Sequence, residues 1–347
     1  MKGIVCAGHW VLDHIKFVDH WPNLSELSNI SIEFITNGGA PFNILVDLAN
    51  LKVDFPCYGI GCVGDDPASQ HVLRICAEKN INTEFLRIMP GETTSYTDVM
   101  TMEENGMRTM FHYRGVNRKF IRQYVPIEEL KRRDPKLFYL GHLLLMDGLE
   151  KPSVKYGISA AHLLHDIKTK TNMDTVVDIA TESSQRYDAI VLPCLPYTDH
   201  FIINELETQK ITKIPVRKKN GELILKDLKE GARIILDHGV RKNVVIHMPE
   251  GAYWLTKERK GLWYPSLEIP NTFFKAACGA GDAFCAGSMV GLHKEWSIEE
   301  TLKLATATAA AAIHSSSNSD GIKPIKKTLQ LADRFPLRGE LVYDNNK

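Results

Sequence analysis

The sequence predicts an α/β protein with a doubly wound, mainly parallel sheet flanked by helices, and with a small antiparallel β-sheet lid. Two observations lead to this class. Short apolar runs rich in β-branched residues alternate with helical patterns, which is typical of a parallel sheet covered on both faces. Two other segments alternate apolar and polar residues around polar turns, which is typical of antiparallel strands.

Buried strands are expected wherever a short apolar run is bounded by polar or turn residues. Such runs lie at 3–7, 55–60, 137–140, 176–179, 189–192 and 244–247. The segments 17–35 and 93–113 interrupt this rhythm, and Glu103 to Gly106 has the composition of a hairpin tip. We therefore expect one large α/β domain over 1–347, with a lid built from about 9–35 and 93–114.

Two helices have clear start signals. Gly38, Gly39 and Ala40 precede Pro41, a residue favoured in the first turn of a helix. Ser297 and Glu300 have the spacing of a capping box ahead of the Ala-rich segment 302–313. Helices are predicted after both signals.

Composition excludes several classes of protein. The 42 Lys and Arg residues balance the 42 Asp and Glu residues, so the broad positive surface of a nucleic-acid or membrane binder is not expected. The seven cysteines form no C-x-x-C pair, which favours free thiols in a reducing compartment. Without a signal-peptide pattern or an apolar run of about 18 residues, we expect a cytoplasmic protein.

The strongest chemical signal is the segment Gly279-Ala280-Gly281-Asp282 ahead of a helical pattern. Glycines at a helix start allow successive backbone N–H groups to point toward one anion, where the helix dipole adds positive charge. Taken alone, an Asp in the first helical turn is more often a cap than a catalyst.

Two weaker signals accompany this turn. Gly38 and Gly39 with Asn43 open a helix, although two glycines alone can simply form a tight loop. Asn204, Glu205 and Glu207 gather one amide and two carboxylates, a pattern that usually marks a solvated helix face. If these carboxylates face phosphates, they hold Mg²⁺ through its water shell.

In this order, the segments resemble the PfkB/ribokinase family of sugar and nucleoside kinases from residue 8 to about 323. The resemblance implies a ribokinase-like fold and transfer of phosphate from ATP, with Mg²⁺, to a hydroxymethyl group of a sugar. It casts Asp282 as catalytic base, and Gly279, Ala280 and Gly281 as the anion hole. The implied sites on either side of this turn are the acceptor residues Asp13, Gly38, Gly39 and Asn43, the nucleotide and phosphate residues Asn204, Glu207, Gly251 and Cys278, and the metal residues Glu205 and Glu207, which act through water.

Arg108 lies in the expected lid and is a further candidate for contact with an anionic or polyhydroxyl substrate, although an exposed hairpin Arg is the simpler interpretation. The unpaired lid edge is a plausible homodimer surface. Gly-Gly-Ala-Pro with Asn43 looks more like fructokinase-type members than adenosine kinases. Sugar phosphates and nucleosides nevertheless stay open as acceptors.

The chain departs from the family pattern at three places. Ala276, Ala277 and Cys278 replace the acidic segment before the glycine turn, which argues against activation by a monovalent cation. Met248 and Ala180 replace a Gly and an Asn that are common in the family. These departures motivate one alternative, a catalytically impaired sugar- or nucleotide-binding regulatory protein of the same fold.

A second alternative comes from Gly59 to Gly64, which matches the dinucleotide fingerprint G-x-G-x-x-G and suggests an NAD-dependent oxidoreductase. Asp65 and Asp66 follow it directly. Negative charge at that place opposes pyrophosphate binding, so this alternative is weaker than the kinase hypothesis.

Overall fold

The computed structural model describes residues 2–275 and 278–344. Within these residues, the strands of the large sheet follow the spatial order β16-β15-β14-β13-β12-β11-β8-β1-β4-β5. From β13 to β5 every neighbouring pair is parallel, and β14, β15 and β16 add antiparallel strands at one edge. The bounds are β1 Ile4–Gly8, β4 Cys57–Gly64, β5 Asn82–Met89, β8 Leu137–Leu143, β11 Asp174–Ile179, β12 His200–Asn204, β13 Asn243–Met248, β14 Gly251–Thr256, β15 Gly261–Pro265 and β16 Val342–Asp344.

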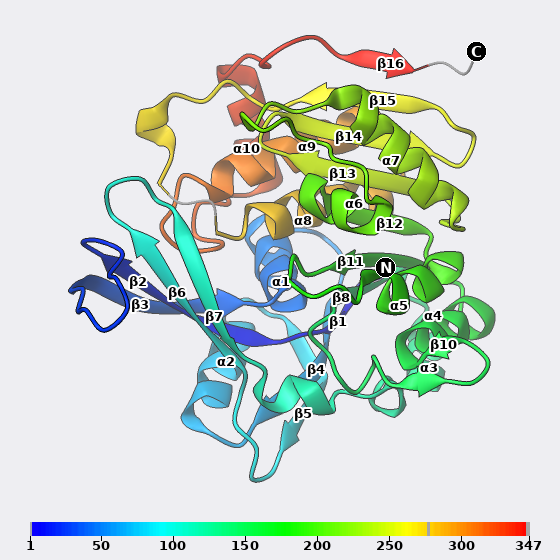
Figure 1. Cartoon of the computed structure of the whole chain (residues 1–347). Helices are drawn as coiled ribbons and strands as arrows, with labels where there is room; N and C mark the ends of the chain where they lie inside the picture. The colour runs from blue at the N-terminus through cyan, green and yellow to red at the C-terminus, as the bar shows by residue number, and fades with distance from the viewer. Residues whose placement is uncertain (1, 276–277, 345–347) are drawn as a thin grey trace.

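Helices cover both faces of this sheet (Figure 1). One face packs against α1 Ala40–Asn50, α2 Pro67–Glu78, α8 Ala280–Lys294, α9 Ile298–Ala312 and α10 Ile325–Arg334. The other packs against α3 Ile127–Arg133, α4 Ser159–Lys170, α5 Tyr187–Ile190, α6 Glu205–Thr212 and α7 Leu225–Asp237. Short 3₁₀ turns are η1 Gly115–Lys119, η2 Arg122–Tyr124, η3 Leu192–Tyr197 and η4 Asn271–Phe273. The doubly wound α/β class is confirmed.

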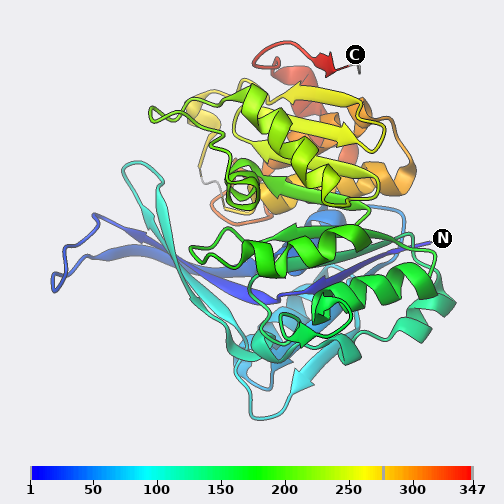
Figure 2. The same ribbon diagram turned by 45° about the vertical axis from the view of Figure 1, so that its right-hand side comes forward.

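The lid is a separate sheet of order β3-β2-β6-β7, formed by β2 Val11–Val18, β3 Ile30–Gly38, β6 Tyr96–Met102 and β7 Arg108–Tyr113. It projects from the large sheet, as Figure 2 shows. The pairs β2–β3 and β6–β7 are antiparallel as predicted, but β2 and β6 pair in parallel, so the sheet is mixed and not wholly antiparallel. Two distant hairpins meet side by side, and local turn signals cannot fix the direction of such a pairing.

The expected strand at 189–192 is also wrong. This run lies in α5 and in the 3₁₀ turn η3, since a short apolar run does not distinguish a buried strand from a buried helical turn. A further two-stranded ribbon joins β9 Pro152–Ser153 to β10 Gly157–Ile158. Among the described helices, none is long and apolar enough to cross a lipid bilayer.

The strand order reverses between β1 and β8. From β1 the chain adds β4 and β5 on one side, and from β8 it adds β11, β12 and β13 on the other. Ligands of open α/β sheets bind outside the carboxyl ends of the strands at such a switch point. His9 and the lid strand β2 follow the end of β1 directly, so the fold places the lid over this point.

Candidate active site

The segment 279–282 forms the start of α8, as predicted. Gly279 caps this helix with φ 75° and ψ −4°, a left-handed conformation that favours glycine. A Cβ at Gly279 would lie 2.7 Å from the carbonyl oxygen of Asn318. The N–H groups in the first turn of a helix lack carbonyl partners within that helix, so this turn presents donors to an anion.

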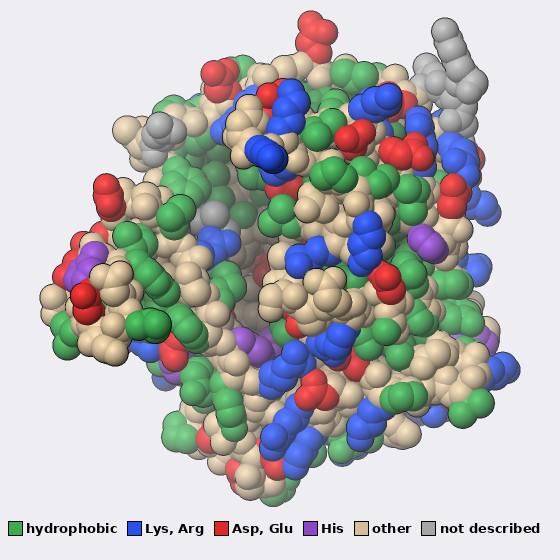
Figure 3. Space-filling model, in the orientation of Figure 1, with side chains coloured by type: hydrophobic (Ala, Val, Ile, Leu, Met, Phe, Trp, Pro, Cys, Tyr) green, Lys and Arg blue, Asp and Glu red, His purple; other side chains and the backbone are tan. Residues whose placement is uncertain are grey.

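Two cavities meet at this turn. The lid cavity, of about 650 Å³, lies between the lid and the carboxyl ends of the central strands. The hairpin cavity, of about 320 Å³, lies beside the β13–β14 hairpin and α9. Gly281 and His247 line both cavities, and a Cβ at Gly281 would lie 3.1 Å from His247 Cε1. Figure 3 shows the hollow between the lid and the body of the molecule.

Asp282 faces the lid cavity and is held by two groups. Its Oδ2 accepts a hydrogen bond of 2.7 Å from Asn43 Nδ2, and His142 Nε2 lies 3.9 Å from Oδ1. Asn43 is itself fixed, because its Oδ1 accepts a bond of 2.6 Å from Asn37 Nδ2. Burial raises the pKa of Asp282, and His142 and Asn43 partly offset this rise.

The predicted acceptor residues gather around the same cavity. Asp13, Gly39, Asn43 and Arg108 line it. Asp13 accepts a hydrogen bond of 2.8 Å from Asn318 Nδ2, and burial raises its pKa to about 7. Gly38 packs directly against the Asp13 carboxylate. A Cβ at Gly38 would lie 2.3 Å from Asp13 Oδ1, so this close approach requires glycine.

A cluster of three histidines at the lid cavity was not predicted from the sequence. His9, His112 and His142 line the lid cavity, and the Nε2 atoms of His9 and His112 lie 3.1 Å apart. His112 Nδ1 lies 3.0 Å from Thr97 Oγ1. Burial lowers the pKa of His112 to about 4 and also lowers that of His9 and His142. These residues come from three distant segments, so no local signal in one sequence unites them.

Asn204 and Glu207 form a capping box at the start of α6 and also line the lid cavity. Glu207 accepts hydrogen bonds from Thr181 Oγ1 at 2.6 Å and from the Asn204 N–H at 2.9 Å. Burial raises the pKa of Glu207 to about 7. Each carboxylate oxygen keeps lone pairs for a water molecule, so this pair fits the predicted water-mediated Mg²⁺ contact.

Glu205 turns to the hairpin cavity instead. Its Oε1 lies 2.7 Å from Arg217 Nη2, and Arg217 Nη1 lies 2.7 Å from Glu250 Oε1. A carboxylate held by a guanidinium is less available to a metal ion than the Glu207 carboxylate. Glu207 is therefore the better candidate of the two predicted metal residues.

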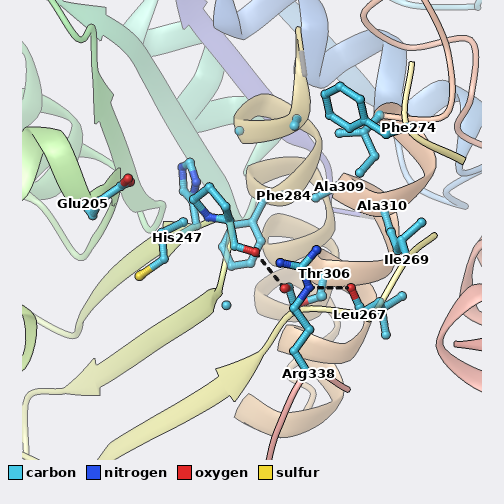
Figure 4. A pocket seen from close by; sticks show the side chains of 17 residues that line it. Glu205, His247, Leu267, Ile269, Phe274, Phe284, Thr306, Ala309, Ala310 and Arg338 are labelled. Atoms are coloured by element: carbon cyan, nitrogen blue, oxygen red, sulfur yellow. Dashed lines mark hydrogen bonds between the residues drawn. The ribbon is translucent and has the colours of Figure 1, made fainter. Parts of the chain in front are cut away.

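The hairpin cavity is mostly apolar (Figure 4). Gly251, the predicted nucleotide residue, and Ala280, from the predicted anion hole, line it together with Leu267, Ile269 and Phe274. A Cβ at Gly251 would lie 2.5 Å from the Tyr264 carbonyl oxygen. Arg338 closes one side by donating a backbone bond of 2.9 Å to the Ser266 carbonyl. An apolar slot with few polar groups suits a flat aromatic base.

Cys278 was assigned to the nucleotide side, but it lines the lid cavity. Burial raises the pKa of its thiol to about 12. Of the departures from the family pattern, Met248 lines the hairpin cavity and Ala180 the lid cavity. Ala276 and Ala277 lie outside the described residues.

The dinucleotide fingerprint has a packing role. Gly59 to Gly64 lies inside β4, and a Cβ at Gly59 or Gly61 would lie 2.6 or 2.2 Å from the Trp10 ring. The Asp66 side chain caps α2 through the Ser69 N–H. These glycines make room for Trp10, and the segment is not the strand-to-helix turn that binds a pyrophosphate.

Comparison with known proteins agrees with this geometry. The family model of the pfkB family carbohydrate kinases matches residues 1–325. A probable chloroplastic fructokinase-6 of Arabidopsis thaliana is 27% identical over 89% of this chain and 75% of its own length. A 5-dehydro-2-deoxygluconokinase of Clostridium beijerinckii is 25% identical over 83% of this chain and 81% of its own.

Solved structures show the same fold. Ribokinase from Thermotoga maritima superposes with a TM-score of 0.76 at 18% identity, covering 96% of this chain and 100% of its own. Ribokinase from Arabidopsis thaliana, solved with ribose and ATP, gives 0.76 at 18% identity, covering 95% and 99%. The family match spans almost the whole chain, and with the ribokinase-like fold it shows that this chain is a carbohydrate kinase of the PfkB family.

Proposed function

We propose that the protein transfers the terminal phosphoryl group of ATP, with Mg²⁺, to a hydroxymethyl group of a sugar. The observation that supports this most strongly is the shared wall of the two cavities at Gly281, next to Asp282. A nucleotide in the hairpin cavity and a sugar in the lid cavity would meet where Gly281, at the start of α8, lies beside His247 of β13. Phosphoryl transfer depends chiefly on such positioning and on charge stabilisation.

In this proposal Asp282 accepts the proton of the attacking hydroxyl. Asn43 orients this carboxylate through the 2.7 Å bond to Oδ2, which leaves Oδ1 available to the acceptor hydroxyl in the lid cavity. Burial disfavours the charged form of Asp282 and so raises its pKa. The higher pKa makes this carboxylate a stronger base for the hydroxyl proton. The first N–H groups of α8 would bind the equatorial oxygens of the transferred group.

Asn204 and Glu207, which line the lid cavity, would hold the metal ion through water. Mg²⁺, when bound, neutralises charge on the phosphate oxygens. Glu207 is oriented for this role by Thr181 and by the Asn204 backbone. The lid would exclude water, which otherwise competes as the phosphoryl acceptor.

A fructokinase- or ribokinase-like acceptor is supported by Asp13, Asn43 and Gly39 at one end of the lid cavity. Dimerisation through the lid is supported by its exposed apolar side chains. These include Ile30, Ile32, Met110 and Phe111, on the edge strands β3 and β7. A second copy would cover both the apolar side chains and the unpaired strand edges.

The test is phosphorylation of a panel of sugars, sugar phosphates and nucleosides by Mg·ATP, followed by detection of the phosphorylated product. Asp282→Asn is expected to lower kcat by about 10²- to 10⁴-fold, the usual contribution of a positioned base. Asp188→Asn, an exposed Asp outside both cavities, is the matched control. Near-normal kcat in Asp282→Asn would reject the assignment of the base.

Ala180 and Met248 depart from the family pattern and line the two cavities, which favours one second candidate: a family member that binds sugar or nucleotide without turnover. The same experiment separates the two functions. A regulatory protein binds nucleotide or sugar and gives no product with any acceptor, whereas a kinase turns over at least one of them.

A further inference from the structure

Three potential metal ligands converge on the lid cavity at the switch point of the sheet. His142, Asp178 and Asp282 each place one ligand atom within 4.8 Å of the other two. The 3.9 Å between His142 Nε2 and Asp282 Oδ1 is too long for a hydrogen bond. Two ligand atoms that each lie about 2.1 Å from one tetrahedral ion are about 3.4 Å apart, so a side-chain movement of about 0.5 Å would bring both atoms into coordination.

Asp178 supplies an independent observation. It is only 8% exposed, and within the described residues its Oδ1 has no hydrogen-bond partner. Tyr139 donates its hydroxyl to Oδ2 and so fixes the carboxylate. A buried carboxylate oxygen without a partner is costly, and a bound cation removes that cost.

Within the described residues, neither carboxylate forms an ion pair with a Lys or Arg side chain. Among the ion pairs of the described residues, Asp282 has only His142 as a partner, and Asp178 has none. Asp178 and Asp282 lie close enough to repel each other. A divalent cation between them would reverse this repulsion.

The ligand types indicate which ion would bind. Mg²⁺ and Ca²⁺ prefer oxygen ligands, whereas an imidazole with two carboxylates suits Zn²⁺, Mn²⁺ or Co²⁺. Three protein ligands leave a fourth position open, as in catalytic zinc sites. All three side chains line the lid cavity, so that position faces the space assigned to the sugar.

We propose that His142, Asp178 and Asp282 bind a transition-metal ion such as Zn²⁺, separate from the Mg²⁺ that accompanies ATP, and that this ion inhibits phosphoryl transfer. Inhibition follows because a carboxylate that coordinates the ion cannot also accept the hydroxyl proton. The inhibitory part rests on the proposed function, whereas metal binding does not.

The binding test uses the full chain in equilibrium dialysis against Zn²⁺, without nucleotide or sugar, followed by elemental analysis. One ion per chain is expected for the wild type. His142→Gln and Asp178→Asn each remove one ligand and are expected to weaken binding by at least about tenfold, because losses of 10- to 100-fold already follow changes one shell further out. His20→Gln is the matched control, since His20 lies 2.8 Å from Asp19 on the exposed lid.

Thermal unfolding without metal verifies that each variant is folded, and the two ligand variants test the site separately. Unchanged zinc affinity in both folded variants, or no binding by the wild type, would overturn the site.

The second test measures kinase activity at fixed Mg·ATP and varied acceptor. Zn²⁺ is expected to inhibit competitively with the acceptor, a chelator is expected to reverse this, and the inhibition constant is expected to rise at least about tenfold in Asp178→Asn. Tight zinc binding with undiminished turnover would overturn the inhibitory part. If no acceptor is phosphorylated at all, the proposed function fails, and the dialysis result still decides the metal site.

Discussion

The buried carboxyl of Asp13 makes a quantitative prediction about stability. Burial raises its pKa from 3.8 to about 7, and the hydrogen bond from Asn318 only partly opposes this. One pKa unit corresponds to about 1.36 kcal/mol, so ionised Asp13 costs the folded state about 4 kcal/mol above pH 7. Asp13→Asn removes the ionisable group and with it this cost.

The sign of the pH dependence of stability follows from the difference in proton binding between the folded and unfolded states. Between pH 4 and pH 7 the folded state keeps the proton of Asp13, whereas the unfolded state has lost it, so stability falls as the pH rises. The free energy of unfolding of Asp13→Asn, relative to the wild type, should therefore increase by about 3 kcal/mol from pH 5 to pH 8. Any hydrogen bond changed by the substitution adds an offset that is the same at both pH values.

Urea unfolding at pH 5 and pH 8, followed by circular dichroism, measures this difference. Glu207, whose pKa is also raised to about 7, titrates in both proteins and cancels. The control is Asp134→Asn, where the Lys2 ammonium and a hydrogen bond from Asn172 lower the pKa of a partly exposed carboxyl. Its effect should not change between pH 5 and pH 8, because Asp134 and Lys2 are both ionised throughout. An equal effect of Asp13→Asn at both pH values would refute the reasoning.

Two further substitutions test the glycine turn before α8 and the hairpin cavity, and one chemical modification tests the Cys278 thiol. Gly279→Ala combines φ 75° with a Cβ 2.7 Å from a backbone oxygen, whereas Gly91→Ala has φ 72° and open space, so the first should cost about 1–3 kcal/mol more in urea unfolding and should lower kcat. Arg217→Met leaves the buried Glu205 without its cation, so we expect about 2 kcal/mol of destabilisation and a KM for ATP that rises more than kcat falls. Cys278 should resist iodoacetamide at pH 8 in the native protein, as mass spectrometry can show, because a pKa of about 12 leaves almost no thiolate.

Local signals explain what could be predicted. The starts of α1, α8 and α9 depend on residues within one helical turn, and the capping box of Ser297 and Glu300 forms as expected. The parallel pairing of β2 with β6 and the antiparallel edge β14–β16 depend on contacts between distant segments. Hydrophobic periodicity carries no information about such partners.

The residues of the candidate site also divide into those that local sequence signals predict and those that depend on contacts between distant segments. Asp282 and Asn43 belong to recognisable glycine segments, and the structure joins them by a hydrogen bond. His9 and His142 meet because β1 and β8 are neighbours in the large sheet, and His112 reaches them from the lid strand β7. A histidine at the end of a strand has no distinguishing pattern until its neighbours in space are known.

The charge of the lid cavity narrows the choice of acceptor. The carboxylates of Asp13, Asp178, Glu182, Glu207 and Asp282 line it, and within the described chain Arg108 is the one Lys or Arg side chain that does so. Above pH 7, where Asp13 and Glu207 lose their protons, the carboxylates accept hydrogen bonds from hydroxyl groups and repel an anionic substituent, which a single guanidinium only partly offsets. We therefore expect kcat/KM to be higher for neutral sugars than for the corresponding sugar phosphates or sugar acids. Arg108→Gln separates the two cases, because it should weaken an anionic acceptor far more than a neutral one. A panel in which only phosphorylated or carboxylated sugars react, with strong loss in Arg108→Gln, would show that Arg108 outweighs the surrounding carboxylates.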